Sequence, residues 1–178
     1  MSYSRRIWTL IHLSFILKNL SNYLINNILK YFAYGSNMNP ARVQERGLQV
    51  VRAQSATLRD FRLVFNKVST THADIAHANV QFKRGECVEG VLYDLSTDAE
   101  IFKMDPFERA PWNYGRDAVL VDTAERAEWC WTYFANPGVI SAGKLPSRDY
   151  MSHLLAGEQF LTPAYMAMLS AHPTAQTG

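Results

Sequence analysis

Apolar and polar residues alternate along much of the chain after residue 30, as they do in antiparallel strands with one buried face. The alternation is clearest over residues 56–68, ATLRDFRLVFNKV. The segment KRGE, residues 83–86, separates two shorter runs and predicts a connection between two strands. Together the patterns predict strands at residues 31–34, 56–68, 75–82, 87–95, 116–122 and 128–134.

Capping residues predict short helices between and after these strands. Thr97 and Glu100 have the spacing of a capping box, which would open a helix that continues to about Phe107. The other predicted helices begin at Asn39-Pro40, Ser147 and Thr162-Pro163, and the first two end near Gly47 and Gly157. Many antiparallel strands with few helices predict an α+β fold, a small mixed or antiparallel β-barrel with flanking short helices.

The first thirty residues differ from the rest, because they contain no Gly, Ala, Val, Pro, Asp or Glu. Leucines recur at spacings of three and four, which makes one apolar stripe on a helix. The segment is too polar to span a bilayer, and no small-residue cleavage site follows it. Three interpretations remain open: a basic amphipathic helix in weak contact with a membrane or partner, a helix docked on the same chain, or an extension upstream of the native start.

We therefore divide the chain into an N-terminal basic amphipathic extension (1–30), a domain (31–170) and a tail (171–178). Of the 178 residues, 48% are apolar and 19% charged, an ordinary globular balance. The net charge of +2 comes from the extension, since residues 31–178 hold 14 basic and 16 acidic residues, or −2. Such a domain has no general attraction for nucleic acid. We expect a cytoplasmic protein, and the sequence leaves its oligomeric state open.

Several kinds of chemistry find little support in the motifs. The two cysteines, Cys87 and Cys130, lack the spacing of a zinc site or a disulfide framework, and Cys130 lies between two tryptophans as a core residue would. His72 and His77 are separated by four residues, a weak spacing for a pair of metal ligands. Ser36 as a nucleophile lacks a recognisable general base. We expect no metal and no cofactor.

The segment YGSN, residues 34–37, follows an apolar strand and leads into the helix capped at Asn39. Backbone N–H groups at such a position point outward and favour an anion. Gly35 permits a close approach of a ligand. The same four residues are also typical of a plain turn.

A second segment, residues 104–116, places Glu108 after an apolar helix end and among the aromatic residues Phe107, Trp112 and Tyr114. Aromatic cover raises the pKa of a carboxyl group and suits it to proton transfer near neutrality. The alternative is a surface carboxylate paired with Arg109 or Arg116.

In combination, these segments resemble the gamma-glutamylcyclotransferase family (AIG2-like). The resemblance runs from residue 31 to about residue 169 and leaves residues 1–30 outside. It rests on five segments in the same order: YFAYGSNM (31–38), AHANVQF (76–82), CVEGVLYDLS (87–96), MDPFE with NYGR (104–116), and PSRDY (146–150).

The resemblance implies a small barrel and a cyclisation of a gamma-glutamyl amide to 5-oxoproline, with release of an amine or amino acid. It implies that Glu108 is the catalytic acid and base, and that backbone donors of the YGSN loop bind the glutamyl carboxylate and carbonyl. Tyr133 is a further candidate for the wall of the substrate-binding site. The substrate-binding residues implied or expected are Tyr31, Phe32, Ala33, Tyr34, Gly35, Ser36, Asn37, Tyr114 and Tyr150.

One departure concerns the residue after the catalytic glutamate, which is Gly in many relatives and Arg109 here. Arg109 could lower the pKa of Glu108 or reach a substrate carboxylate. The leaving group stays open: an amino acid, a peptide such as glutathione, or an alkylamine. Two other functions compete with this one, a non-catalytic small-molecule binding module on the same fold and a serine hydrolase that uses Ser36.

Overall fold

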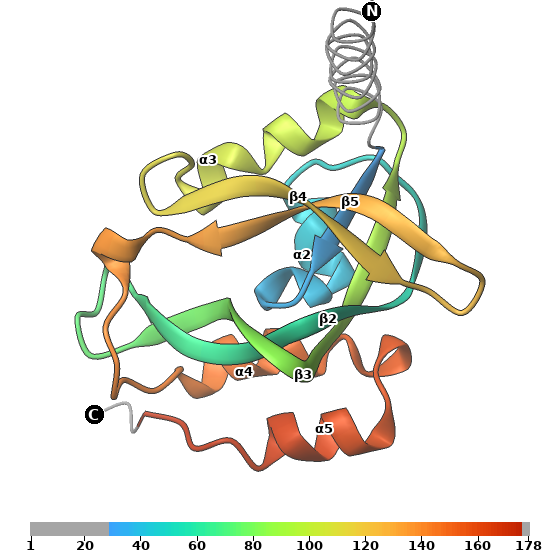
Figure 1. The fold of residues 1–178 in the computed structure, drawn as a ribbon. Coiled ribbons are helices and arrows are strands. Elements are labelled where there is room, and N and C mark those ends of the chain that lie inside the picture. The colour runs from blue at the N-terminus through green and yellow to red at the C-terminus, as the bar shows by residue number, and fades with distance from the viewer. Residues whose placement is uncertain (1–28, 176–178) are drawn as a thin grey trace, which may run out of the picture.

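In the computed structural model, which describes residues 29–175, five strands form a closed barrel (Figure 1). The strand order is β1-β3-β2-β4-β5, and β5 closes the barrel by pairing in parallel with β1, while the other pairs are antiparallel. The strands are β1 (Lys30–Ala33), β2 (Val50–Val68), β3 (Ala76–Leu95), β4 (Tyr114–Asp122) and β5 (Ala127–Ala135). The predicted α+β barrel is confirmed.

The longest strands correct two predicted boundaries. Strand β2 begins at Val50 rather than at residue 56, and the two strands predicted on either side of KRGE are one strand, β3. The KRGE residues of β3 lie opposite the single residue Asp60 of β2, where the register between the two strands shifts. The pair absorbs the extra residues as a bulge instead of a turn. There the Gly85 N–H donates to Asp60 Oδ1 at 2.8 Å.

The helices begin where their capping side chains predict, with one exception. Asn39 accepts from the Ala41 N–H, Ser147 from that of Tyr150, and Thr162 from that of Tyr165. These caps open α2 (Pro40–Glu45), α4 (Arg148–Leu155) and α5 (Pro163–Ser170). The exception is the capping box at Thr97, which makes no side-chain cap.

The segment after Thr97 forms two short helices instead of one, the 3₁₀ helix η2 (Asp98–Lys103) and α3 (Asp105–Glu108). The Glu100 carboxylate accepts from the Gln49 N–H and from Lys103 Nζ, and so it is not available for the capping box. Three more 3₁₀ helices are η1 (Ser36–Met38), η3 (Pro137–Val139) and η4 (Glu158–Phe160).

The helices cover opposite sides of the barrel. Helices α4 and α5 lie side by side below β2 and β3, and α3 lies across the barrel from them (Figure 1). The core is built from inward side chains of the strands together with Met38, Ile101, Met104 and Leu154, all almost fully buried. This arrangement brings the end of β1, α3 and the first turn of α4 toward one another. No helix within residues 29–175 is long and apolar enough to cross a membrane.

Candidate active site

A small cavity lies where β1 ends and meets α3 and α4. We call it the inner cavity, and its volume of about 30 Å³ is close to that of one water molecule. Its lining residues are Tyr31, Tyr34, Gly35, Ser36, Asn37, Ala78, Glu108, Tyr114, Thr132, Tyr133 and Tyr150. Glu108 is the one acidic side chain among them, and the rest of the wall is mostly tyrosine and the 34–37 loop.

Two side chains hold the Glu108 carboxylate in place. Asn37 Nδ2 donates to Glu108 Oε1 at 3.0 Å, and Arg46 Nη1 contacts the same oxygen at 3.2 Å. Both partners come from the chain segment directly after β1, whereas Glu108 is the last residue of α3. The carboxylate is therefore oriented by distant parts of the sequence, and its side chain is only 16% exposed.

Burial raises the pKa of Glu108 above its ordinary value. The positive charge of Arg46, the hydrogen bonds from Asn37 and Arg46, and the charge of Lys67 oppose this rise without cancelling it. A carboxyl group with a raised pKa exchanges protons more readily near neutral pH. This environment suits Glu108 to act as both base and acid.

Hydrogen bonds fix the tyrosines of the inner cavity. Asn37 Nδ2 donates to Tyr31 Oη at 2.8 Å, and the Tyr34 hydroxyl donates to the Tyr133 carbonyl. The Tyr114 hydroxyl donates to the Ala78 carbonyl at 2.8 Å.

The Ala78 N–H donates to Tyr150 Oη at 3.1 Å, which holds the first turn of α4 against β3. Burial raises the pKa of Tyr150 to about 12, so this hydroxyl stays neutral at physiological pH. The tyrosines therefore form a neutral, rigid wall around one carboxylate.

Helix α3 is anchored through its first residue, Asp105. The Tyr133 hydroxyl donates to Asp105 Oδ1 at 2.6 Å, and Arg116 Nη1 lies 2.9 Å from both carboxylate oxygens. Because α3 spans only four residues, fixing Asp105 also fixes the position of Glu108. The predicted alternative for Glu108, a surface pair with Arg109 or Arg116, is wrong: Arg116 pairs with Asp105, and the partner of Glu108 is Arg46.

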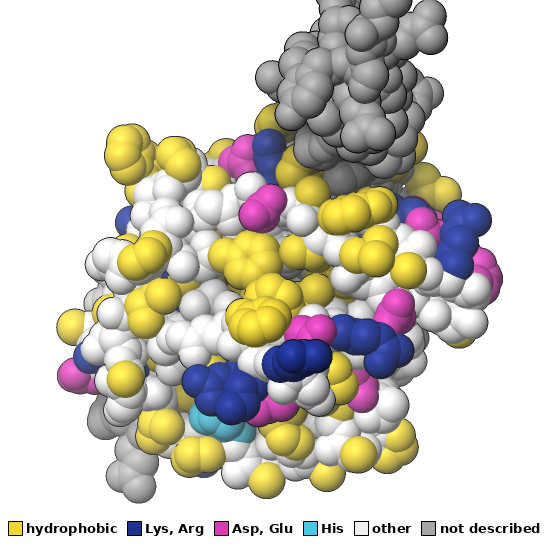
Figure 2. Space-filling view, viewed as in Figure 1, with side chains coloured by type: hydrophobic (Ala, Val, Ile, Leu, Met, Phe, Trp, Pro, Cys, Tyr) yellow, Lys and Arg dark blue, Asp and Glu magenta, His cyan; other side chains and the backbone are white. Residues whose placement is uncertain are grey.

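A second cavity, which we call the basic cavity, adjoins the inner one. Its volume is about 160 Å³, and it shares Ser36, Glu108, Tyr114 and Tyr150 with the inner cavity. The side chains of Arg42, Arg46, Lys67 and Arg109 also line it. On the face drawn in Figure 2, Lys and Arg side chains lie together with Asp and Glu side chains over the lower part, in the region of β2, β3 and α4.

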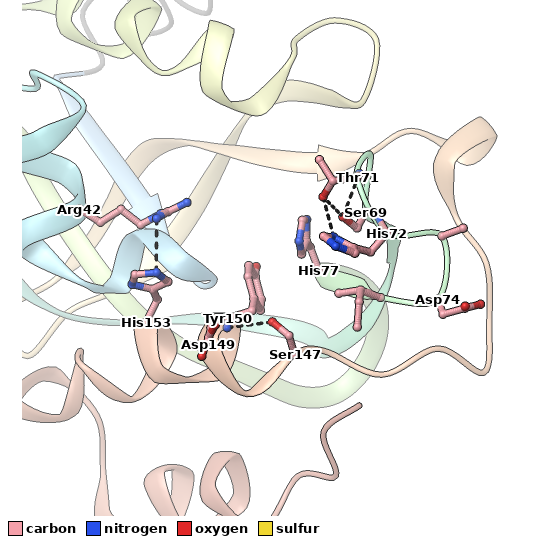
Figure 3. Close-up of a pocket in the computed structure, with 12 residues that line it drawn as sticks. Arg42, Ser69, Thr71, His72, Asp74, His77, Ser147, Asp149, Tyr150 and His153 are labelled. Carbon is pink, nitrogen blue, oxygen red and sulfur yellow. Dashed lines mark hydrogen bonds between the residues drawn. The ribbon is translucent and has the colours of Figure 1, made fainter. Parts of the chain in front are cut away.

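A third cavity, the outer groove, has a volume of about 690 Å³ and continues past Arg42, His77 and Tyr150. Figure 3 shows Tyr150 from α4 and His77 from β3 facing each other at its centre. Their rings stack with centroids 4.6 Å apart. The outer groove contains no part of Glu108, so we assign the chemistry to the smaller cavities and regard the groove as their approach from solvent.

The structure brings most of the predicted site residues together. Tyr31, Tyr34, Gly35, Ser36, Asn37, Glu108, Tyr114, Tyr133 and Tyr150 all line the inner cavity. Phe32 and Ala33 do not line any of the three cavities. Both are almost fully buried in the core, since they precede the point where the chain turns into the 34–37 loop.

Several lining residues have no signal in the sequence. Lys67 is a single cation near the end of β2, next to a register shift between Phe65 and Lys67, and its side chain lines the basic cavity. Arg42 of α2 and Arg46, which follows that helix, lie one turn apart, a spacing typical of an ordinary polar helix face.

Other predicted features are resolved as follows. Cys130 is buried in the core, as expected, and burial raises the pKa of its thiol well above the usual range. His72 Nδ1 lies 2.9 Å from Thr71 Oγ1, and His77 stacks on Tyr150. Within residues 29–175, no three His, Cys, Asp or Glu side chains are grouped as metal ligands.

Comparison with known proteins identifies the family of the chain. The family model described as gamma-glutamyl cyclotransferase, AIG2-like, matches residues 31–152, so the chain belongs to that family. No curated protein sequence matches the chain.

Solved structures share the fold. One named gamma-glutamyl cyclotransferase superposes with a TM-score of 0.73 at 24% identity, over 84% of this chain and 90% of its own. An uncharacterised human protein has a TM-score of 0.70 at 26% identity, over 84% of this chain and 91% of its own. A yeast gamma-glutamyl cyclotransferase specific to glutathione has a TM-score of 0.59 at 13% identity, over 81% of this chain and 94% of its own.

Proposed function

We propose that this protein is a gamma-glutamylcyclotransferase that converts a gamma-glutamyl amide to 5-oxoproline and releases an amine or amino acid. The observation that carries the proposal is the Glu108 carboxyl group, held by Asn37 and Arg46 beside the Gly35-Ser36 backbone and with its pKa raised by burial. Membership of the family supports the reaction type. No cofactor takes part in the proposed chemistry.

In this reaction the substrate's own α-nitrogen attacks its γ-carbonyl carbon. A new C–N bond closes the five-membered ring, and the C–N bond to the leaving amine breaks. The α-ammonium loses two protons, and the leaving nitrogen gains two to depart as an ammonium group. Glu108 carries a proton from one nitrogen to the other, a role worth about 10²–10⁴-fold in rate. Neither water nor a protein nucleophile is consumed.

Binding in a curled conformation supplies much of the remaining acceleration. Well-oriented intramolecular reactions gain about 7–11 kcal/mol over their bimolecular counterparts. The Gly35 and Ser36 amides are our candidates for binding the α-carboxylate and the carbonyl oxygen. Asn37 Oδ1 is buried without a hydrogen-bond partner within residues 29–175, so it is our candidate acceptor for the α-ammonium.

A glutamyl group is larger than the inner cavity, so the substrate must extend from the inner cavity into the basic one. Glu108 and Ser36 line both cavities. The reacting carbonyl would therefore lie at their junction, with the glutamyl end on the tyrosine side and the leaving group on the basic side. This placement puts both nitrogens within reach of one carboxylate.

The test is the formation of 5-oxoproline from purified full-length protein and a panel of gamma-glutamyl amino acids, glutathione and gamma-glutamyl alkylamines. We expect turnover of at least one compound and a loss of about 10²–10⁴-fold in Glu108→Gln. Gln keeps the size of the side chain but does not accept the proton. Glu45→Gln, on the exposed side of α2, is the matched control and should retain activity.

Two results would overturn the proposal. Binding of gamma-glutamyl compounds without any 5-oxoproline would identify a non-catalytic binding module. A Ser36→Ala variant that is inactive, beside a Glu108→Gln variant that is not, would favour a serine hydrolase. Against the latter, burial and the charges of Lys67 and Arg42 lower the pKa of His77, the imidazole that lines the same cavity as Ser36, to about 4.

A further inference from the structure

The basic cavity carries more positive charge than its one carboxylate balances. Four cationic side chains, Arg42, Arg46, Lys67 and Arg109, line it together with Glu108. Among residues 29–175, Glu108 forms its ion pair with Arg46. Since the whole chain has a net charge of only +2, this excess is a local feature of the cavity.

Lys67 is the most informative of the four. Lys67 as a whole residue is 4% exposed, yet no carboxylate within residues 29–175 lies within 4.0 Å of Nζ. The Tyr114 ring lies beside it, with its centroid 5.6 Å from Nζ. A buried ammonium without a counter-charge is costly, and proteins keep such groups mainly where a ligand completes them.

No group around Lys67 supplies a carboxylate in contact with it, since Glu108, whose charge acts on Lys67, is already paired with Arg46. His77 stays neutral at physiological pH, because burial, Lys67 and Arg42 lower its pKa to about 4. The Nε of Arg42 is buried without a hydrogen-bond partner within the described residues, and its Nη1 lies 3.3 Å from the ring nitrogen Nε2 of His153. The cavity therefore has two buried donors without an anionic partner.

The glutamyl end of the substrate does not balance these charges. It carries one carboxylate and one ammonium, and the proposed function places it in the inner cavity. The leaving group is the part that extends into the basic cavity. In a released α-amino acid, the carboxylate lies two bonds from the departing nitrogen and so stays close to Glu108. Lys67 is within electrostatic reach of that point, because its charge lowers the pKa of Glu108.

We propose that the basic cavity binds a carboxylate of the leaving group, so that this enzyme prefers gamma-glutamyl amino acids or peptides over gamma-glutamyl alkylamines. This inference rests on the proposed function. Lys67 contacts the carboxylate and Arg109 closes the exposed side of the cavity. The outer groove, which continues beyond Arg42 and Tyr150, leaves room for a second residue of a peptide.

The test compares gamma-glutamyl-alanine with gamma-glutamyl-alaninamide, which differ by one negative charge and are nearly equal in size. We expect kcat/KM to favour the acid by about tenfold or more, as a charge-assisted hydrogen bond would. In Lys67→Met the ratio of the two kcat/KM values should fall toward one. Lys83→Met, an exposed lysine in the bulge of β3, should keep the wild-type ratio.

Arg109→Gln is a second variant that does not disturb buried packing, since Arg109 is exposed. It should reduce the same ratio by a smaller factor. Equal turnover of acid and amide by the wild type would overturn the inference, as would a ratio unchanged in Lys67→Met. So would a Lys67→Met loss of equal size on both substrates, because Lys67 would then bind the glutamyl carboxylate.

Calorimetric binding of the two compounds to Glu108→Gln separates this inference from the proposed function. Tighter binding of the acid than of the amide, with the difference lost in Glu108→Gln/Lys67→Met, would support carboxylate binding in the basic cavity. This holds even if the wild type forms no 5-oxoproline, because that failure would overturn only the proposed reaction. Equal binding of acid and amide would overturn the inference while leaving the reaction intact.

Discussion

Gly35→Ala gives the sharpest test of how the site is packed. A Cβ atom at position 35 would lie 3.0 Å from Tyr150 Oη and 3.2 Å from Ala78 Cβ. Both distances are tighter than ordinary contacts, so a neighbour must move. The backbone angle itself is not the obstacle, since φ of Gly35 is −119°, a value that other residues adopt.

The cost follows from what moves. If Tyr150 shifts, its hydroxyl loses the hydrogen bond from the Ala78 N–H, worth about 0.5–1.5 kcal/mol. Inserting a methyl group into a packed site costs about 1–3 kcal/mol. We therefore expect Gly35→Ala to lower the free energy of unfolding by about 1–3 kcal/mol. A displaced Tyr150 should also lower kcat/KM by about 10–100-fold, because small misplacements around a substrate are costly.

A double-mutant cycle tests the reasoning. Urea denaturation is measured for the wild type, Gly35→Ala, Tyr150→Phe and the double variant. Removing the hydroxyl removes the contact at 3.0 Å, so the cost of Gly35→Ala should fall by about 1 kcal/mol in the Tyr150→Phe background. Gly138→Ala, where a Cβ meets no atom within 4 Å, is the matched control.

Two outcomes would refute this account. Additive effects in the cycle, within about 0.5 kcal/mol, would mean that the Tyr150 hydroxyl is not what the added methyl group meets. A Ser36→Ala variant that loses more activity than Gly35→Ala would contradict the role of the loop backbone, because the Ser36 N–H survives that change and only a hydroxyl is lost.

Four further outcomes are expected. Glu108→Gln should raise stability at neutral pH. Burial raises the folded-state pKa of Glu108 above 4.5, so the wild type loses stability as pH rises from about 4.5 through that pKa, whereas the variant does not. Thermal melts across pH check this. Arg46→Gln should raise the pKa of Glu108 and move the acidic limb of the kcat/KM profile to higher pH; an unchanged limb would contradict the Arg46 contact. A chain starting at Leu29, which keeps the Lys30–Asp94 ion pair, should remain folded and active by circular dichroism and 5-oxoproline assay; loss of either would favour docking of the preceding segment. Activity should also survive dialysis against a chelator.

Arg109 illustrates how the sequence and the structure inform each other. The family resemblance implies only that Arg stands here where many relatives have Gly. In the structure, Arg109 ends α3 with φ of 49°, in the left-handed region that favours Gly. The arginine is held in an unfavourable conformation beside the basic cavity, which is consistent with a role in binding rather than in stability.

Local chemistry determined much of the fold. The caps at Asn39, Ser147 and Thr162 act over two or three residues, so the sequence alone locates the starts of α2, α4 and α5. Alternation likewise predicts the strands, because each strand must present one face to the core. Local patterns also marked Glu108 and the 34–37 loop as candidates, and the resemblance of whole segments to a family decided between the alternatives that those patterns left open.

Only the tertiary structure decided what surrounds Glu108. Arg46 reaches it across 62 positions of the chain, and Lys67 lines the same cavity from β2, far from Glu108 in the sequence. The continuity of β3 through KRGE has the same origin, since pairing with β2 stabilises a segment that would be a turn in isolation. Such contacts join residues far apart in sequence, and their energies depend on burial and on charges that no local pattern encodes. The sequence therefore specified the elements and the candidate acid, while the closure of the barrel decided which cations would face it.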